Sequence, residues 1–438
     1  MWVHAGVEYR VNLQHDDPIK QEHLRAVERY IAARPLSVRL INDGRDAGVS
    51  QLRVQTSDPL AGVRVAEFFP TGSLSCLDYL PLGRAGGEQP CALRLVGVHV
   101  ACVGRTRSGK TEGAIWTIID RLSACRDAVI WGIDLQNGPA FPMWRGVIQE
   151  VAYDPESAER LLHMALDEIS RRMAVLRRLA ESDDDDTAGT TWTPDLGNYL
   201  FIIVDEFALA AAYDGKAEMK DEPNLVKPLK DIIRISLKVG VHLILASQKT
   251  GNSDFGDSVI SSQVSTKILL ACLERDTVTL LSTTQRDQGW APHLLQPFQS
   301  REDPRDAGVD YIESPVHSMP ERYKFDFWPE GEVKRRARQR LADGLPSLDD
   351  SAANVITDAV EVPEILAKVK KTFERLGYPE LAPTREILAD LGPEWNSQKL
   401  AEALKPHGME STQQRVDPRA NPVRGYLRDD LDAALQGL

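Results

Sequence analysis

The chain has 438 residues, of which 42% are hydrophobic and 27% are charged. These proportions exclude a wholly disordered, collagen-like or coiled-coil chain, and the length predicts two to four domains. No run approaches the roughly 18 apolar residues that a membrane span requires. The N-terminus also lacks a basic segment followed by an apolar one, so the sequence predicts a cytoplasmic protein.

The charge balance is acidic, with 52 Lys and Arg against 65 Asp and Glu and a formal net charge of −13. This balance argues against a histone-like protein. It does not exclude a nucleic-acid partner, because phosphates are contacted by a local basic surface. The five cysteines are odd in number and form no CxxC pair, so neither a disulfide framework nor a zinc site is predicted.

The first segment, residues 1–78, is predicted to be a small α/β domain. Strand-like patterns lie at 7–13, 36–41 and 51–55, and apolar residues at helical spacing indicate a helix at 19–33. No group of residues in this segment suggests chemistry.

The second segment, residues 79–300, is predicted to be the largest domain. Short apolar runs alternate in it with helical patterns, which is typical of a mainly parallel sheet covered by helices on both faces. The runs lie at 98–103, 128–133, 200–204, 241–246 and 266–271. The predicted fold class is therefore α/β.

A glycine-rich loop follows the first of these runs. Gly104-Arg-Thr-Arg-Ser-Gly-Lys-Thr111 fits the pattern GxxxxGK[ST] and precedes a helical pattern, the context of a phosphate-binding loop. In such a loop the backbone N–H groups face the phosphates, the lysine reaches the β- and γ-phosphates, and the hydroxyl residue holds Mg²⁺. Lys110 is also predicted to be catalytic, and Thr111 to be a ligand of Mg²⁺. The predicted ATP-binding residues are Gly104, Arg105, Thr106, Arg107, Ser108, Gly109, Lys110, Thr111 and Glu112.

Two further apolar runs end in polar residues. Asp205 and Glu206 follow the run at 200–204; Asp205 is expected to organise the Mg²⁺ shell, and Glu206 to polarise the attacking water. Gln248 follows the run at 241–246 and is predicted to sense the γ-phosphate or to position the water, because parallel strands open onto the ligand at their carboxyl ends. The alternative, that Ser247 and Gln248 only cap the strand, stays open. The strand spacing suits a RecA-like P-loop core.

The rest of the chain is predicted to be a linker and a small domain. Residues 301–358 are rich in Pro, Asp and Arg and carry the run Arg335-Arg-Ala-Arg-Gln-Arg340, which indicates a linker. Residues 359–438 are predicted to be winged-helix-like. The expected helices lie at 362–376, 384–391 and 397–404, and the expected hairpin strands at 409–416 and 423–427.

A winged helix offers its third helix to the major groove of DNA. Here that helix would present Ser397, Gln398 and Lys399. The basic residues expected at the edge of the wing, where they would suit phosphates, are Arg415, Arg419, Arg424 and Arg428. Acidic residues outnumber basic ones from Ser351 onward, so a protein-binding winged helix and a plain helical cap stay open as alternatives.

Several ordered motifs carry a resemblance to a known family. They are Asp58-Pro-Leu60, Pro81-Leu-Gly83, His99, Gly104 to Thr111, Trp131-Gly-Ile-Asp134, Arg171-Arg-Met173, Val204-Asp-Glu206, Gly240-Val-His242 and Ala246-Ser-Gln248. Over about residues 57–300 the chain resembles the FtsK/SpoIIIE family of DNA-pumping ATPases, especially the actinobacterial plasmid-transfer members. The resemblance implies a homo-hexameric ring of RecA-like subunits that hydrolyses ATP with Mg²⁺. Such a ring moves double-stranded DNA in conjugative transfer or chromosome segregation.

The chain departs from the family pattern at several positions. The family usually has a glycine at the position of Arg107. Its rings also insert an arginine into the neighbouring subunit's site, and the nearest equivalent positions here are Leu237 and Val278. The nearby cations that are candidates for this role are Arg234, Lys238 and Arg275. Anchored members carry upstream membrane helices. Three alternatives stay open here: an upstream segment is absent, another protein supplies a membrane or septum anchor or a pore, or the motor works unanchored.

Two other functions stay open. One is a protein-export ATPase related to type VII secretion, which shares the core but usually has several ATPase modules in tandem. The other is a DNA-binding regulator in which the ATPase core only switches the assembly state.

Overall fold

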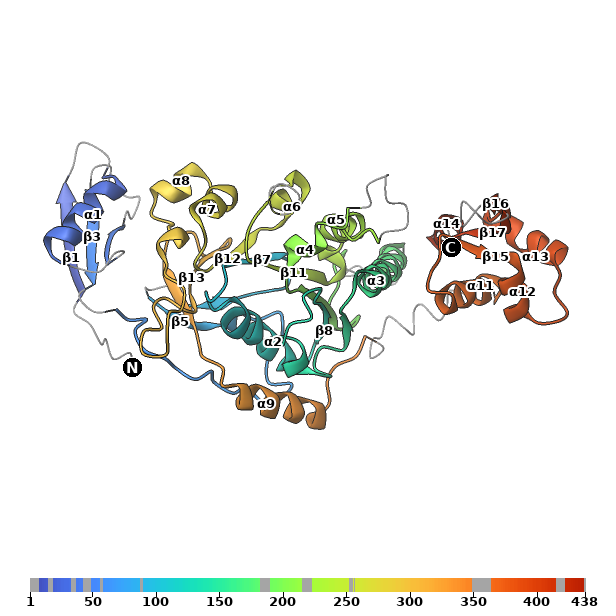
Figure 1. Cartoon of the computed structure of the whole chain (residues 1–438), viewed down its shortest axis with the longest axis horizontal. Coiled ribbons are helices and arrows are strands. Elements are labelled where there is room, and N and C mark those ends of the chain that lie inside the picture. Colours follow the sequence, from blue (N-terminus) through green and yellow to red (C-terminus); the bar gives the residue numbers. More distant parts are fainter. Residues whose placement is uncertain are drawn as a thin grey trace. The chain divides into compact units, whose positions relative to one another are not determined.

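The structure is a computed structural model in which the chain forms two compact units, each described here by itself (Figure 1). One comprises Met1–Ala165 with Thr191–Asp350, and the other comprises Leu166–Thr190 with Ser351–Leu438. The described residues are 8–14, 19–32, 37–41, 49–55, 58–86, 90–181, 190–214, 223–251, 255, 257–348, 364–414 and 422–436. No helix among these residues has the length and apolar character needed to cross a membrane.

The N-terminal elements follow the predicted order. Strand β1 (Glu8–Gln14) pairs antiparallel with β3 (Val49–Gln55), which pairs antiparallel with β2 (Val38–Ile41). Helix α1 (Gln21–Tyr30) contributes Leu24 to a small core. The other buried members of this core are Val38 and Leu52.

A nine-stranded sheet forms the centre of the first unit, in the order β5-β14-β13-β12-β7-β11-β10-β8-β9. The strands from β12 to β9 pair in parallel, whereas β13, β14 and β5 extend the sheet antiparallel. The α/β class and the mainly parallel, RecA-like sheet are therefore as predicted. The bounds are β5 (Gly83–Ala85), β7 (Val100–Val103), β8 (Ala128–Ile133), β9 (Glu150–Ala152), β10 (Tyr199–Val204), β11 (Val241–Ser247), β12 (Thr266–Leu269), β13 (Val309–Glu313) and β14 (Arg322–Phe325), with a separate antiparallel pair β4 (Leu80–Pro81) and β6 (Ala92–Leu93).

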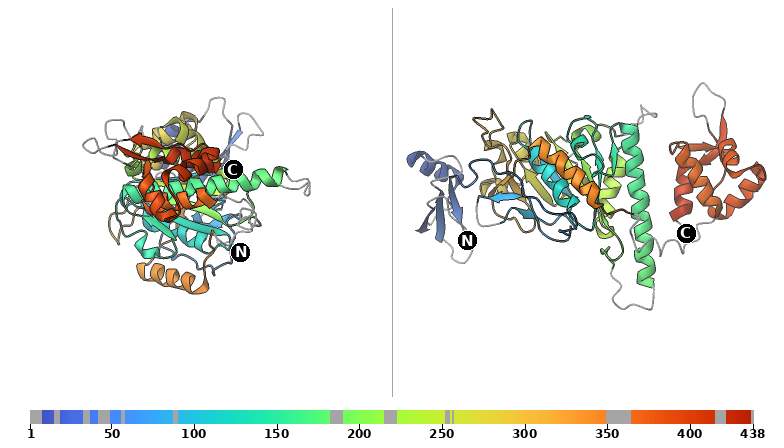
Figure 2. Two further views of the ribbon diagram at one scale, coloured as in Figure 1. Left: turned by 90° about the vertical axis from the view of Figure 1, so that its right-hand side faces the viewer. Right: turned by 90° about the horizontal axis from the view of Figure 1, so that it is seen from below.

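Helices lie on both faces of this sheet, with α2 and α9 on one face and α5 on the other (Figures 1 and 2). Strands β7, β8, β10 and β11 are buried along their whole length because both faces are covered, which explains their uninterrupted apolar runs. The helices are η1 (Lys110–Ile115), α2 (Trp116–Ser123), η2 (Pro142–Trp144), α3 (Pro155–Glu181), α4 (Phe207–Ala210), α5 (Val226–Ile235), η3 (Leu237–Val239), α6 (Ser258–Gln263), α7 (Glu274–Leu280), α8 (Thr283–Asp287), η4 (Pro292–Leu294) and α9 (Glu330–Asp343).

The structure differs from the predicted boundaries of the central domain. The segment 301–358 was expected to be a linker, but β13 and β14 extend the central sheet and α9 packs beside α2. At the other side, residues 58–78 belong with the sheet rather than with the small N-terminal domain, since Leu74 forms a β-bridge with Cys125 and Val65 forms one with Phe327.

The second unit contains a helical domain with a small antiparallel sheet in the order β15-β17-β16. Its elements are α11 (Glu364–Arg375), β15 (Leu381–Pro383), α12 (Thr384–Leu391), α13 (Ser397–Leu404), η5 (Lys405–His407), β16 (Thr412–Gln414), β17 (Val423–Leu427) and α14 (Arg428–Gln436). Leu366, Phe373 and Leu400 are fully buried in its core. The order helix, strand, two helices and two strands is that of a winged helix, and β15 and α14 are additions to the predicted elements.

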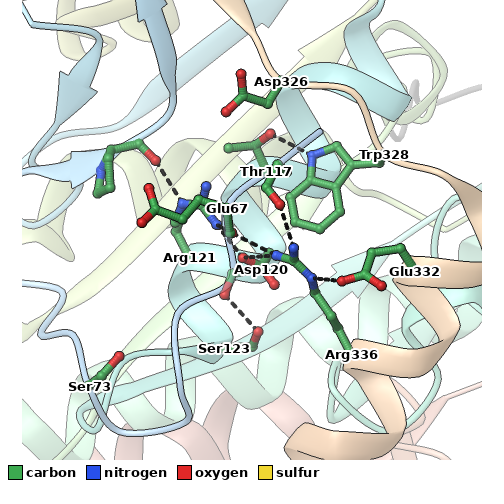
Figure 3. Close-up of polar contacts among 12 residues, drawn as sticks. Glu67, Ser73, Thr117, Asp120, Arg121, Ser123, Asp326, Trp328, Glu332 and Arg336 are labelled. Carbon is green, nitrogen blue, oxygen red and sulfur yellow. Dashed lines mark hydrogen bonds and ion pairs between the residues drawn. The ribbon is translucent and has the colours of Figure 1, made fainter. Parts of the chain in front are cut away.

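A buried charge cluster joins α9 to α2 (Figure 3). Asp120 contacts Arg121 and lies 3.4 Å from Arg336 (Oδ2 to Nη1). It also lies 3.6 Å from Arg340 (Oδ1 to Nη2). All four side chains are at most 2% exposed. Burial lowers the pKa of Arg121 and of Arg340. Asp120 therefore supplies a counter-charge that lets three arginines be buried together.

We expect Asp120→Asn to lower the free energy of unfolding by about 3–5 kcal/mol, because it leaves buried arginines without this counter-charge. Chemical unfolding of the full chain measures this loss. Glu330→Gln is the control, since Glu330 is an exposed acid in the first turn of α9, and it should change stability little. Equal losses in the two variants would contradict the role of Asp120.

Candidate nucleotide-binding site

The glycine-rich loop begins at the end of β7, in the middle of the sheet. The Gly104 N–H donates to the Ser247 carbonyl at 3.1 Å, and the Arg105 N–H donates to the Ala271 carbonyl at 2.9 Å. These hydrogen bonds fix the loop to β11 and to the segment after β12, the two strands that neighbour β7. It leads into η1 and then into α2, so strand, loop and helix have the predicted order.

Glycine is required at two loop positions for different reasons. Gly109 has a φ of +92°, and a Cβ there would lie 2.5 Å from the Gly308 nitrogen. A Cβ on Gly104 would lie 2.5 Å from Ser108 Oγ and 2.8 Å from Leu270 Cβ. The curled backbone therefore depends on close approaches that only a residue without a side chain permits.

Two residues beyond the motif also hold the loop. The Phe298 N–H donates to the Arg107 carbonyl at 2.8 Å, and the Gly308 N–H donates to the Ser108 carbonyl at 2.8 Å. Gly308 lies in the stretch that was predicted to be a linker. The sequence could not predict that Gly308 holds the loop, because a hydrogen bond from a backbone N–H does not require any particular side chain or motif.

Lys110 and the acid pair meet at the carboxyl end of the sheet. The Lys110 ammonium donates to the Asp205 carbonyl at 3.0 Å and lies 3.3 Å from Glu206 Oε2. The exposed fractions of Lys110, Asp205 and Glu206 are 7%, 6% and 6%. The structure therefore brings together residues that are 95 and 96 positions apart in the chain.

Glu206 is held by strand β11 as well as by Lys110. Its Oε1 accepts hydrogen bonds from Ser247 Oγ at 2.7 Å and from the Gln248 N–H at 3.1 Å. The Gln248 side chain in turn accepts a hydrogen bond from Thr106 Oγ1 at 2.9 Å. Gln248 thus joins the phosphate-binding loop to the second acid, an arrangement that goes beyond plain capping of the strand.

Asp205 has the chemistry of a metal ligand. Its Oδ1 is buried and accepts no hydrogen bond from the described residues. Burial raises the pKa of Asp205, and the carboxylates of Asp134 and Glu206 raise it further, whereas Lys110 lowers it. A cation beside this oxygen would satisfy it, and the half-buried Thr111 in the first turn after the loop carries the hydroxyl expected of the second ligand.

Asp134 is a further buried carboxylate near the acid pair. It is fully buried at the end of β8, where it accepts the N–H groups of Gln136 at 3.0 Å and Gly138 at 2.8 Å. Burial raises its pKa, and these hydrogen bonds oppose the increase. Its hydrogen bonds shape the turn after β8. No group of three or more His, Cys, Asp or Glu among the described residues could by itself hold a metal ion.

His99 has a structural role. Its Nδ1 accepts the Leu243 N–H at 3.0 Å, and its Nε2 lies 3.2 Å from the Ile233 carbonyl. Burial lowers its pKa to about 4, so the ring is neutral at pH 7. His99 therefore ties the start of β7 to β11 and α5.

The remaining predicted residues lie at the surface. Thr106, Arg107 and Glu112 are exposed. The three candidates for an arginine acting on a neighbouring subunit are also exposed: Arg234, which is 3.6 Å from Asp231, Arg275, which is 3.9 Å from Asp276, and Lys238.

Comparison with known proteins gives structural matches at low identity. No protein-family model and no curated protein matches the chain. The monomer form of the pCW3 conjugation coupling protein TcpA with ATPγS covers 77% of this chain and 91% of its own, with 15% identity and a TM-score of 0.48. The cytoplasmic domain of the Thermomonospora curvata type VII secretion ATPase EccC covers 63% of this chain and 32% of its own, with 19% identity and a TM-score of 0.44.

EssC (ATPases 2 and 3) from Geobacillus thermodenitrificans covers 66% of this chain and 54% of its own, with 13% identity and a TM-score of 0.46. The chain thus spans about a third of the EccC domain and about half of the EssC structure. The resemblance of this chain to FtsK/SpoIIIE ATPases rests on its motifs and on the convergence of loop and acid pair.

We expect Gly109→Ala to weaken nucleotide binding by at least about tenfold, because the new methyl group would meet the Gly308 nitrogen and move the loop. Titration with a fluorescent ATP analogue measures the effect. Gly97→Ala is a matched control, since Gly97 has a φ of +86° and a Cβ there meets nothing within 4 Å. Equal binding by the two variants would show that the contact with Gly308 does not shape the site.

Proposed function

We propose that this chain is an ATP-driven translocase of double-stranded DNA that acts as a ring of identical subunits in plasmid transfer or chromosome segregation. The observation that carries the proposal is the meeting of the Lys110 ammonium with the Asp205 carbonyl and the Glu206 carboxylate. A cation in a phosphate-binding loop beside two acids suits hydrolysis of a nucleoside triphosphate, whereas simple binding does not require the second acid.

The contacts of the site suggest an order of events. When a triphosphate enters, the Lys110 ammonium leaves the Glu206 carboxylate and contacts the phosphates. The Glu206 carboxylate then becomes available to orient water. Bound Mg²⁺, held by Thr111 and Asp205, would neutralise charge that develops on the phosphates. Gln248 is hydrogen-bonded to Thr106, so a movement of the loop on nucleotide binding would also move Gln248 and the end of strand β11.

The winged-helix domain is proposed to contact DNA. Asn396 caps α13 by accepting the N–H groups of Gln398 and Lys399, both at 3.0 Å. Ser397, Gln398 and Lys399 are exposed, as is Arg424 on β17. The predicted wing residues Arg415 and Arg419 lie outside the described residues. Arg428 begins α14 and is half-buried, so it is not on the wing.

The motor proposal is tested with Lys110→Ala. ATP hydrolysis in the presence of duplex DNA, and ATP-dependent displacement of a triplex strand, should both fall by about 100-fold or more, because the loop cation is lost. Lys334→Ala, which removes an exposed lysine of α9, should keep both activities. DNA-stimulated hydrolysis without displacement would favour the regulator. Stimulation by a secreted peptide and not by DNA would favour the protein exporter.

The DNA-binding proposal is tested with Lys399→Ala and Arg424→Ala in the full chain without ATP. Each change should weaken duplex binding and lower the slope of log affinity against log salt by about one, as expected for a lost phosphate contact. Fluorescence anisotropy at several salt concentrations gives both quantities. Lys405→Ala removes an exposed lysine just after α13 and serves as the control. Unchanged slopes in the first two variants would favour a protein partner for this domain.

A further inference from the structure

Arg107 has an unusual backbone conformation for its side chain. Its φ is +67°, in the left-handed region that glycine adopts without steric cost and arginine does not. Such outliers persist only where surrounding contacts fix them, and they are enriched at ligand sites. The position is inside the phosphate-binding loop, between Thr106 and Ser108.

The conformation of Arg107 is fixed by backbone contacts. Its carbonyl accepts the Phe298 N–H at 2.8 Å, and the carbonyl of the next residue, Ser108, accepts the Gly308 N–H at 2.8 Å. The Ser108 N–H donates to the Arg105 carbonyl at 3.0 Å and closes the turn around Arg107. The shape of the loop therefore imposes the positive φ, and none of these contacts needs the arginine side chain.

The guanidinium of Arg107 is exposed, and no described residue forms a hydrogen bond or ion pair with it. Arg305 offers a contrast, because it also has a positive φ, of +51°, but its Nε lies 2.6 Å from Asp303 Oδ2. The Glu206 carboxylate is engaged by Lys110, Ser247 and Gln248. Arg107 thus brings an uncompensated positive charge to the loop that would surround the phosphates.

We propose that Arg107 is a nucleotide-positioning residue that binds the triphosphate held by its own loop, as a second cation beside Lys110. This inference rests on the proposed function. A guanidinium presents N–H groups in a planar fork that matches phosphate oxygens, whereas an ammonium acts as a point charge. The free energy cost of the left-handed arginine is then offset when nucleotide binds, because the exposed cation gains an anionic partner.

The test is binding of a fluorescent ATP analogue to the full chain at concentrations low enough to keep it monomeric. Arg107→Gly should weaken binding by about tenfold or more, as expected for loss of a charged hydrogen bond, and should make the affinity less dependent on salt. It should leave the melting temperature without nucleotide unchanged or higher, since glycine suits the positive φ. Arg107→Lys should bind with intermediate affinity.

Arg305→Gly is the matched control, because it removes another left-handed arginine whose partner is already present in the chain, and its affinity for ATP should equal that of the unchanged protein. If Arg107→Gly binds ATP as tightly as the unchanged protein does, or lowers the melting temperature without nucleotide, the inference is wrong. If Arg107→Gly weakens binding only at concentrations where subunits assemble, its partner is a second copy of the chain and the inference is also wrong. Failure of the unchanged protein to bind ATP would instead overturn the proposed function.

Discussion

The position of the Lys110 ammonium constrains the rest of the site. A buried cation is costly unless anions or carbonyl oxygens surround it, and here the Asp205 carbonyl and the Glu206 carboxylate supply them. Without nucleotide, the Lys110 ammonium of the loop and the Glu206 carboxylate after strand β10 therefore compensate each other's charge. Under the proposed function, a triphosphate that draws Lys110 away would also leave Glu206 without that cation, so that nucleotide binding and release of the proposed catalytic acid would be one event.

Residues outside the predicted domain keep the loop and its helix in place. Gly308, just before β13, contacts Gly109 where the helix begins. Arg336 of α9 lies 3.4 Å from Asp120, three residues before α2 ends at Ser123, and so contacts the end of α2 that is remote from the loop. The segment after residue 300 thus fixes the helix at both ends. Under the proposed function the loop would need such a frame, because a displaced helix would move every N–H that is proposed to face the nucleotide.

The sequence predicted the parts of the fold that have strong periodicity or a motif. Strands β7, β8, β10 and β11 are buried on both faces and so appear as apolar runs, and the predicted helices at 384–391 and 397–404 match α12 and α13. Strands β13 and β14 were missed because Asp310, Arg322 and Lys324 are buried polar residues in short strands. Composition alone cannot show that such side chains face the protein interior.

The basic run in α9 shows why charge counts mislead about nucleic-acid contacts. Arg336 and Arg340 are buried against Asp120, and the exposed Arg335 pairs with Glu332 at 2.7 Å. Most of this run therefore stabilises the domain around the central sheet and is not available to contact phosphates. Under the proposed function, an acidic chain whose arginines are partly buried would have to place its remaining cations together to bind DNA, and a ring would do so by repeating one small basic surface around a channel. In that proposed ring the assembly, more than the single subunit, would determine the affinity for DNA.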